Sequence, residues 1–206
     1  MNAQESFVHH MNAMREHHKS GATHTYSVPV DLLYASATND SGLMAFKATD
    51  VAGNSEVTAD LEAYKNDTNS FVEGQRSGAT ASVTILKDNK KPNDATTNSF
   101  VEAMENQKAE AKKASDALIN KNYDKLIKAG IDHPGQQKRI LSATEAIGAF
   151  FTTLLISVGK FFANLASSIV NFFNDIGEWF SNAGKSIANW TSGAISSVGK
   201  FFSSIF

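Results

Sequence analysis

The chain has 206 residues, no cysteine, and 19 basic against 21 acidic residues, which gives a formal net charge of −2. The absence of cysteine excludes disulfides, thiolate metal ligands and a cysteine nucleophile. The near-neutral charge gives no electrostatic support for nucleic acid as a partner. Residues 141–206 hold most of the phenylalanine and both tryptophans, whereas residues 1–140 are polar.

The first residues lack the apolar core of a signal peptide and instead predict a short helix over residues 2–19. One side of this helix carries Phe7, Met11, Met14 and His18. We therefore expect a protein made in the cytoplasm. It would then act peripherally at a membrane or be exported by a route that needs no signal peptide.

The following residues mix two kinds of pattern. Apolar residues alternate over 25–32, as they do in an edge strand, and a second strand-like run occurs at 81–86. Between them, residues 55–71 have helical spacing, and two nearby glycines indicate the end of that helix. The sequence therefore predicts a small mixed α/β polar module over residues 1–94.

Residues 95–130 predict a connecting helix. Ser99 and Glu102 have the spacing of a capping box at its start, and Gly130 indicates its end. Residues 131–141 contain a Pro-Gly pair, which opposes helix continuation, so they predict a hinge.

An eleven-residue repeat fills the tail, residues 142–206, after a second capping-box pattern at Ser142 and Glu145. Eleven residues in three turns is close to the pitch of a straight α-helix, so the apolar positions form one stripe over an arc of roughly 130°. We expect this stripe to insert into a membrane or a partner. Its positions are Phe150, Phe151, Leu154, Val158, Phe161, Phe162, Leu165, Ile169, Phe172, Phe173, Ile176, Trp179, Phe180, Ile187, Trp190, Val198, Phe201 and Phe202.

Two features qualify the predicted tail. Its several glycines weaken a continuous helix, so the tail is predicted to be one long amphipathic helix or a helical hairpin broken near Gly184 or Gly193. Its polar face carries three lysines balanced by three acidic residues. Binding to a bilayer would therefore depend on hydrophobic insertion and not on the charge of the lipid.

The segment FFNDIGEWFSNAGKSIANWTSGAISSVGKFF resembles the repeat regions of phage tail tape-measure proteins, in which Phe and Trp recur at eleven-residue spacing. It is also similar to lipid-packing-sensor helices, which pair bulky apolar residues with a polar face of Ser, Gly and Asn. The first resemblance implies a role in assembly, and the second implies lipid binding. A polar module with a membrane-active tail is also similar to secreted bacterial effectors that act in virulence.

Candidate chemistry is sparse. The histidines near the N-terminus, His9, His10, His17, His18 and His24, lack zinc-site spacing, so we expect no metal there. A pH-sensitive helix and a plain solvated segment both stay open for them. The chain has no P-loop, dinucleotide-binding or hydrolase pattern, so we expect neither an enzyme nor a cofactor.

The sequence therefore predicts a mainly α protein. The leading hypothesis is a non-enzymatic membrane-associating protein, such as a secreted effector or a virion-delivered factor, whose tail inserts into a bilayer interface. The alternative is a structural or assembly protein, tape-measure-like or a homo-oligomer, whose stripe packs against protein. Internal packing against the helical segments 55–75 and 98–129 is a third possibility.

Overall fold

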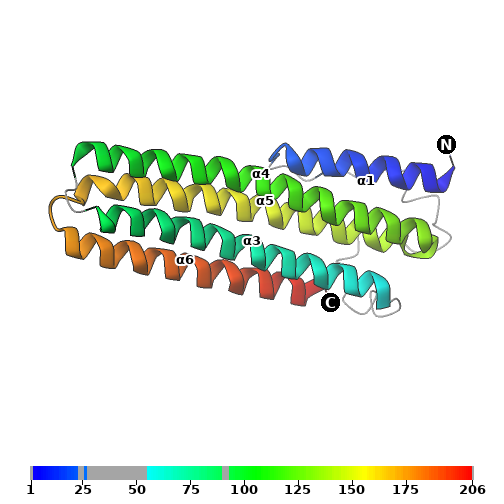
Figure 1. Ribbon diagram of the computed structural model, residues 1–206. Coiled ribbons are helices and arrows are strands. Elements are labelled where there is room, and N and C mark those ends of the chain that lie inside the picture. The colour runs from blue at the N-terminus through cyan, green and yellow to red at the C-terminus, as the bar shows by residue number, and fades with distance from the viewer. Residues whose placement is uncertain (1, 23–25, 27–54, 90–92, 206) are drawn as a thin grey trace. The chain divides into compact units, whose positions relative to one another are not determined.

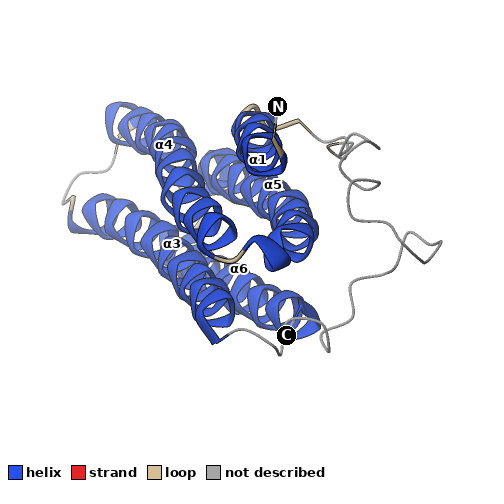
Figure 2. Cartoon of the chain, turned by 90° about the vertical axis from the view of Figure 1, so that its right-hand side faces the viewer, coloured by secondary structure: helices blue, strands red, loops and turns tan. Residues whose placement is uncertain are grey.

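The computed structural model describes residues 2–22, 26, 55–89 and 93–205, and within these ranges every regular element is a helix (Figures 1 and 2). The α-helices in chain order are α1 (Ala3–Lys19), α3 (Ser55–Asp88), α4 (Asp94–Asp132), α5 (Gln137–Ser168) and α6 (Ile176–Ile205). Two short 3-10 helices, η2 (Pro134–Gln136) and η3 (Ile169–Asn171), precede and follow α5.

These helices contribute to two compact units. Unit 1 comprises residues 1–67, 116–153 and 199–206, so it contains α1, the start of α3, the end of α4, the start of α5 and the end of α6. Unit 2 comprises residues 68–115 and 154–198, which hold the remaining parts of α3 to α6.

The mainly α prediction is confirmed, but the mixed α/β module is not supported. Residues 81–86, predicted as a strand, belong to α3, which also continues through Gly74 and Gly78. Ser82 and Thr84 donate side-chain hydrogen bonds to the backbone carbonyls four residues earlier, at 3.2 and 2.9 Å. This pairing lets hydroxyl-bearing residues sit within a helix. The predicted strand at 25–32 falls outside the described residues except for Tyr26, which lies in no regular element.

The predicted helix starts were misplaced in two cases. Ser99 lies inside α4, whose true cap is reciprocal: Asn93 Oδ1 accepts from the Thr96 amide at 3.1 Å, and Thr96 Oγ1 accepts from the Asn93 amide at 2.8 Å. Ser142 lies inside α5, which begins at Gln137. The helix predicted over residues 2–19 is confirmed, and its start is a capping box between Asn2 and Glu5.

The repeat-bearing tail forms two helices. Its break falls at residues 169–175, and not at Gly184 or Gly193, which both lie within α6. Asp175 caps the second helix, since its Oδ1 accepts from the Glu178 amide at 2.8 Å. Of the two predicted forms of the tail, the hairpin is therefore the one present.

Two glycines bring α1 close to its neighbours in unit 1. A Cβ atom on Gly148 of α5 would lie 1.7 Å from Cε1 of His18, and one on Gly130 of α4 would lie 2.3 Å from the ring of Phe7. Arg15 adds an ion pair to Asp124 of α4 at 2.7 Å. The fully buried side chains Phe7, Met11 and Met14 complete the docked face of α1.

The close approach of α1 to α5 makes Gly148→Ala destabilising. Overpacking a tight site costs about 1–3 kcal/mol, which outweighs the roughly 1 kcal/mol that alanine gains over glycine in a helix. Gly159→Ala, one repeat further along α5, is the matched control, because a Cβ there would meet no atom of the described chain within 4 Å. Measured by urea denaturation, the free energy of unfolding should be lower than that of the unaltered chain for Gly148→Ala and higher for Gly159→Ala. Equal stability of the two variants would contradict the packing of His18 on Gly148.

Candidate functional site

The structure buries most of the stripe that was predicted to insert. Of its eighteen residues, twelve are buried, four are intermediate (Phe150, Phe180, Trp190 and Phe201), and two are exposed, Phe173 and Ile176. The stripe is therefore largely covered by the protein itself in this conformation.

Three aromatic pairs join α5 and the turn after it to α6, and we call these three pairs the aromatic ladder. In unit 1, Phe150 and Phe201 stack with ring centroids 4.3 Å apart and planes 6° apart. In unit 2, Phe161 and Trp190 stack at 4.4 Å and 11°. Also in unit 2, Phe172 meets Trp179 edge to face at 5.3 Å and 88°.

The ladder gives the eleven-residue repeat a structural meaning. Phe150 and Phe161 of α5 and Phe172 of the following turn are eleven residues apart, and so are their partners on α6, taken in reverse order. One repeat therefore pairs with another across an antiparallel hairpin. The sequence showed both columns but gave no sign that they face each other.

The indole N–H groups are satisfied within the hairpin. Trp190 Nε1 donates to Ser157 Oγ at 3.1 Å, and Trp179 Nε1 donates to the Ser168 carbonyl at 3.0 Å. Both bonds run from α6 back to α5. The tryptophans therefore act here as hairpin contacts, and their N–H groups have protein partners instead of interfacial water.

Helices α3 and α4 supply the cover. In unit 1, Tyr64 of α3 contacts the rings of Phe151 and Phe202 at centroid distances of 6.4 and 6.2 Å. In unit 2, Phe100 of α4 meets Trp179 edge to face at 5.4 Å. The buried α3 residues of unit 2 are mainly small or polar: Thr68, Phe71, Val72, Gln75, Ala79, Ser82 and Leu86. From the sequence alone, a helix face with so few large apolar residues is not expected to cover a core.

An exposed apolar turn ends the hairpin, and we call residues 169–176 the hairpin tip. Val170 is 76% exposed, Phe173 49% and Ile176 39%, whereas the tip contains no basic residue and one acidic residue, Asp175. Figure 1 shows the turn at the end of unit 2 where α3 ends and α4 begins. Large apolar side chains gathered in one short turn are unusual for a solvent-facing loop.

The helix that leads into the tip is also strongly apolar. Residues 134–171 contain a stretch that could cross a membrane by length and composition, with mean hydropathy 1.7. The sequence alone predicts no transmembrane helix there, because Lys160 interrupts the apolar run. Within the fold, 44% of this stretch is buried, and a single helix of this length and composition is weak evidence for a membrane span.

The N-terminal histidines do not form a metal site in the described part of the chain, where no group of three potential ligands is found. His18 is 6% exposed, and its Nδ1 lies 2.5 Å from the hydroxyl of Tyr123. Burial, with the neighbouring charge of His17, lowers the pKa of His18 to about 4. His17 meets the ring of Tyr26 edge to face, and His24 lies outside the described residues.

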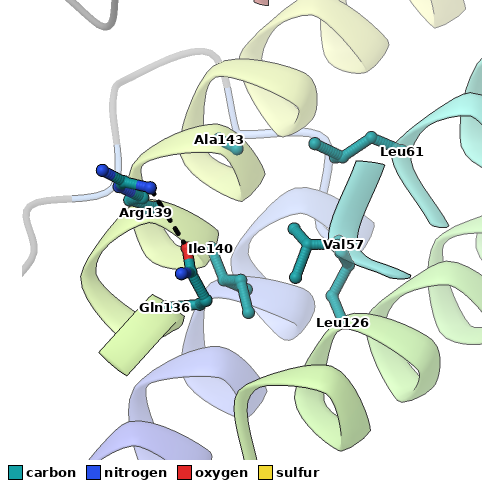
Figure 3. A pocket seen from close by; sticks show the side chains of 7 residues that line it. All are labelled: Val57, Leu61, Leu126, Gln136, Arg139, Ile140 and Ala143. Carbon is teal, nitrogen blue, oxygen red and sulfur yellow. Dashed lines mark hydrogen bonds between the residues drawn. The ribbon is translucent and has the colours of Figure 1, made fainter. Parts of the chain in front are cut away.

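A small recess in unit 1 lies between the start of α3, the end of α4 and the start of α5 (Figure 3). Its empty volume is about 250 Å³, and its walls are mostly apolar. Arg139 donates to Gln136 at 3.4 Å on one side of it, as Figure 3 shows. That volume includes open solvent, and the part that could hold a water-sized group is only about 10 Å³, far below the 300–1,000 Å³ that is typical of ligand pockets.

No protein-family model, no curated protein and no solved structure matches this chain significantly. Function is therefore inferred from the hairpin, its tip and its cover.

The stacked pair Phe161–Trp190 should show a favourable coupling of about 0.5–1.5 kcal/mol in a double-mutant cycle that uses Phe161→Leu and Trp190→Leu. The control cycle pairs Phe161→Leu with Phe180→Leu, because Phe180 is ten residues, about 15 Å, from Trp190 along α6. That control should give a coupling near zero by urea denaturation. Equal coupling in both cycles would mean that the ladder adds nothing beyond apolar burial.

Proposed function

We propose that this protein is a non-enzymatic, membrane-associating helical bundle whose hairpin tip makes the first contact with lipid and whose α5–α6 hairpin then inserts. The observation that carries the proposal is the exposure of Val170, Phe173 and Ile176 in a turn between two apolar helices. Such a protein fits the roles of a secreted effector or a virion-delivered factor.

The tip alone supports weak binding. Fully burying a Val, Ile or Phe side chain contributes about 1.5–3 kcal/mol, and these three are about half exposed, so their insertion contributes roughly 3–5 kcal/mol. That corresponds to a dissociation constant in about the millimolar range. Stable association therefore needs more of the stripe, which in turn needs α3 and α4 to move away from it.

Charge at the tip favours a neutral bilayer over an anionic surface. Lys and Arg draw amphipathic segments to anionic lipid, and residues 169–176 contain neither. The two asparagines and the single acid at the tip are small polar groups that headgroups can solvate. Binding should therefore respond to defects in lipid packing and to curvature more than to lipid charge.

A second candidate function is structural assembly, as in a tape-measure-like protein or a homo-oligomer. It is favoured by the burial of the stripe, because sixteen of its eighteen residues are at least partly covered by protein. In that case the exposed tip would contact another protein chain.

Substituting the tip tests the membrane role without disturbing the core. The variant Val170→Ser/Phe173→Ser/Ile176→Ser should lose at least tenfold in binding to small phosphatidylcholine vesicles, with an unchanged far-UV circular dichroism spectrum. The matched control is Ile85→Ser/Ile131→Ser, which removes two exposed isoleucines of α3 and α4, 73% and 37% exposed, and should bind as the unaltered chain does. Flotation at pH 7 and pH 5 measures both.

Two results would contradict the membrane proposal. One is equal vesicle binding by the tip variant and the control. The other is no binding by the unaltered chain to vesicles of any curvature at either pH. In the second case, a discrete oligomer in sedimentation analysis would favour the assembly function.

A further inference from the structure

We propose that α1 is an acid-sensitive clamp in unit 1, and that protonation of the buried His18 releases this helix from α4 and α5. The release itself needs no lipid. Its use, to free the start of the inserting hairpin, rests on the proposed function.

The His18 ring occupies a site with no room for a hydration shell. The residue is 6% exposed, and the missing side chain of Gly148 lets the ring lie directly on the backbone of α5. An imidazolium ion at this position would lose most of its water. Burial of a charge without a compensating partner opposes the charged form.

The hydrogen bond of the ring fits the neutral state. Tyr123 is fully buried, and burial raises the pKa of its phenol well above the usual range, so the hydroxyl keeps its proton. That hydroxyl can donate to Nδ1 of a neutral His18 across the 2.5 Å separation. A protonated ring carries hydrogen on both nitrogens, so Nδ1 can then only donate to the hydroxyl oxygen, and the hydrogen of the buried hydroxyl loses its acceptor.

The charges around the ring do not compensate a proton on it. From α1 itself the neighbours are the cation Arg15 and His17, whose charge lowers the pKa of His18. The carboxylate that α4 supplies, Asp124, is paired with Arg15, whose guanidinium lies 5.7 Å from the centre of the Tyr123 ring. Within the described residues, no carboxylate forms an ion pair with His18.

Three further titratable groups lie beside His17 and Tyr123. Glu145 of α5 and Tyr64 of α3 both bear on Tyr123, and Tyr26 touches His17. Burial raises the pKa of Glu145, so its protonation favours the folded state as the pH falls and partly opposes the effect of His18. The acid response must therefore be assigned by substitution at His18 itself.

The direction and pH range follow from linkage. The pKa of His18 is about 4 in the folded chain against 6.5 when it is exposed, so the closed clamp binds fewer protons than the open one. Docking of α1 is at full strength above pH 6.5 and weakens as the pH falls from 6.5 to 4. The opening equilibrium should rise up to about tenfold per pH unit, or about 300-fold over the range.

A single cysteine can report the release without lipid, because the chain has none of its own. Met14→Cys places a thiol on the buried face of α1, and its reactivity with a dithiodipyridine is measured from pH 7.5 to 4.5. Met11→Cys gives a second reporter on the same face, and Val158→Cys reports on unit 2. We expect the α1 reporters to become reactive below about pH 6.5 while Val158→Cys stays protected.

Substitution at His18 assigns the effect. His18→Gln and His18→Leu cannot titrate, so reactivity of the α1 reporters should lose its steep rise in acid whatever its level at pH 7.5. His9→Gln on the same helix is exposed and should retain the rise. The proposal is overturned if reporter reactivity rises equally with and without His18. It is also overturned if all three reporters open together, which is global acid unfolding.

Vesicles separate this proposal from the function on which its use depends. If α1 opens in acid but phosphatidylcholine vesicles are bound at neither pH, the clamp stands and the membrane function fails. If vesicles are bound equally at pH 7 and pH 5 while the α1 reporters stay protected, the membrane function stands and the clamp is overturned.

Discussion

Pairing of the eleven-residue repeat with itself is the constraint on which the rest of this structure depends. A repeat close to the natural pitch of the α-helix keeps its apolar stripe straight along α5 and α6. When the chain turns back at residues 169–175, columns that were separate in sequence face each other, and Phe150, Phe161 and Phe172 each find an aromatic partner. A shift of α6 along α5 by one helical turn would separate all three aromatic pairs. The ladder therefore specifies the register of the hairpin and also buries apolar surface.

Because the hairpin sets its own register, α3 and α4 need only present side chains small enough to pack closely against it. Their buried positions in unit 2 include Gln75, Ala79, Ser82 and Ala111, which fill little volume. The buried Ser82 hydroxyl donates to its own helix, so it needs no partner across the interface. A cover built from such residues gains little from each contact. The proposed function requires this cover to leave the hairpin, and small contacts of this kind would make that less costly than the loss of a large interlocked core.

Local patterns predicted the helical class, the helix at residues 2–19 and the stripe, because these depend on spacing within a few turns. The turn at 169–175 was missed since it contains neither Gly nor Pro, and its signal is the capping Asp175. The glycines that were expected to break the tail, Gly184 and Gly193, lie on the exposed side of α6, where they weaken a helix without ending it. The contact between His18 and Gly148 joins residues 130 positions apart, and no periodic pattern in the sequence predicts it.

On the proposed function, the stripe would exchange its protein cover for lipid, and the balance between these two states would depend on weaker interactions elsewhere in the fold. In that exchange the apolar area that the hairpin keeps from water would be similar in both states, so this large contribution would largely cancel between them. What differs is whether α1, α3 and α4 keep their own contacts. In unit 1, α1 contacts α4 and α5 through Phe7 at Gly130, the buried His18 ring at Gly148 and the ion pair of Arg15 with Asp124. Of these groups, the imidazole has a pKa of about 4 when α1 is docked and 6.5 when it is exposed, so it takes up a proton on release in mild acid. A single proton at His18 is therefore well matched to an equilibrium in which the apolar burial of the hairpin is already balanced.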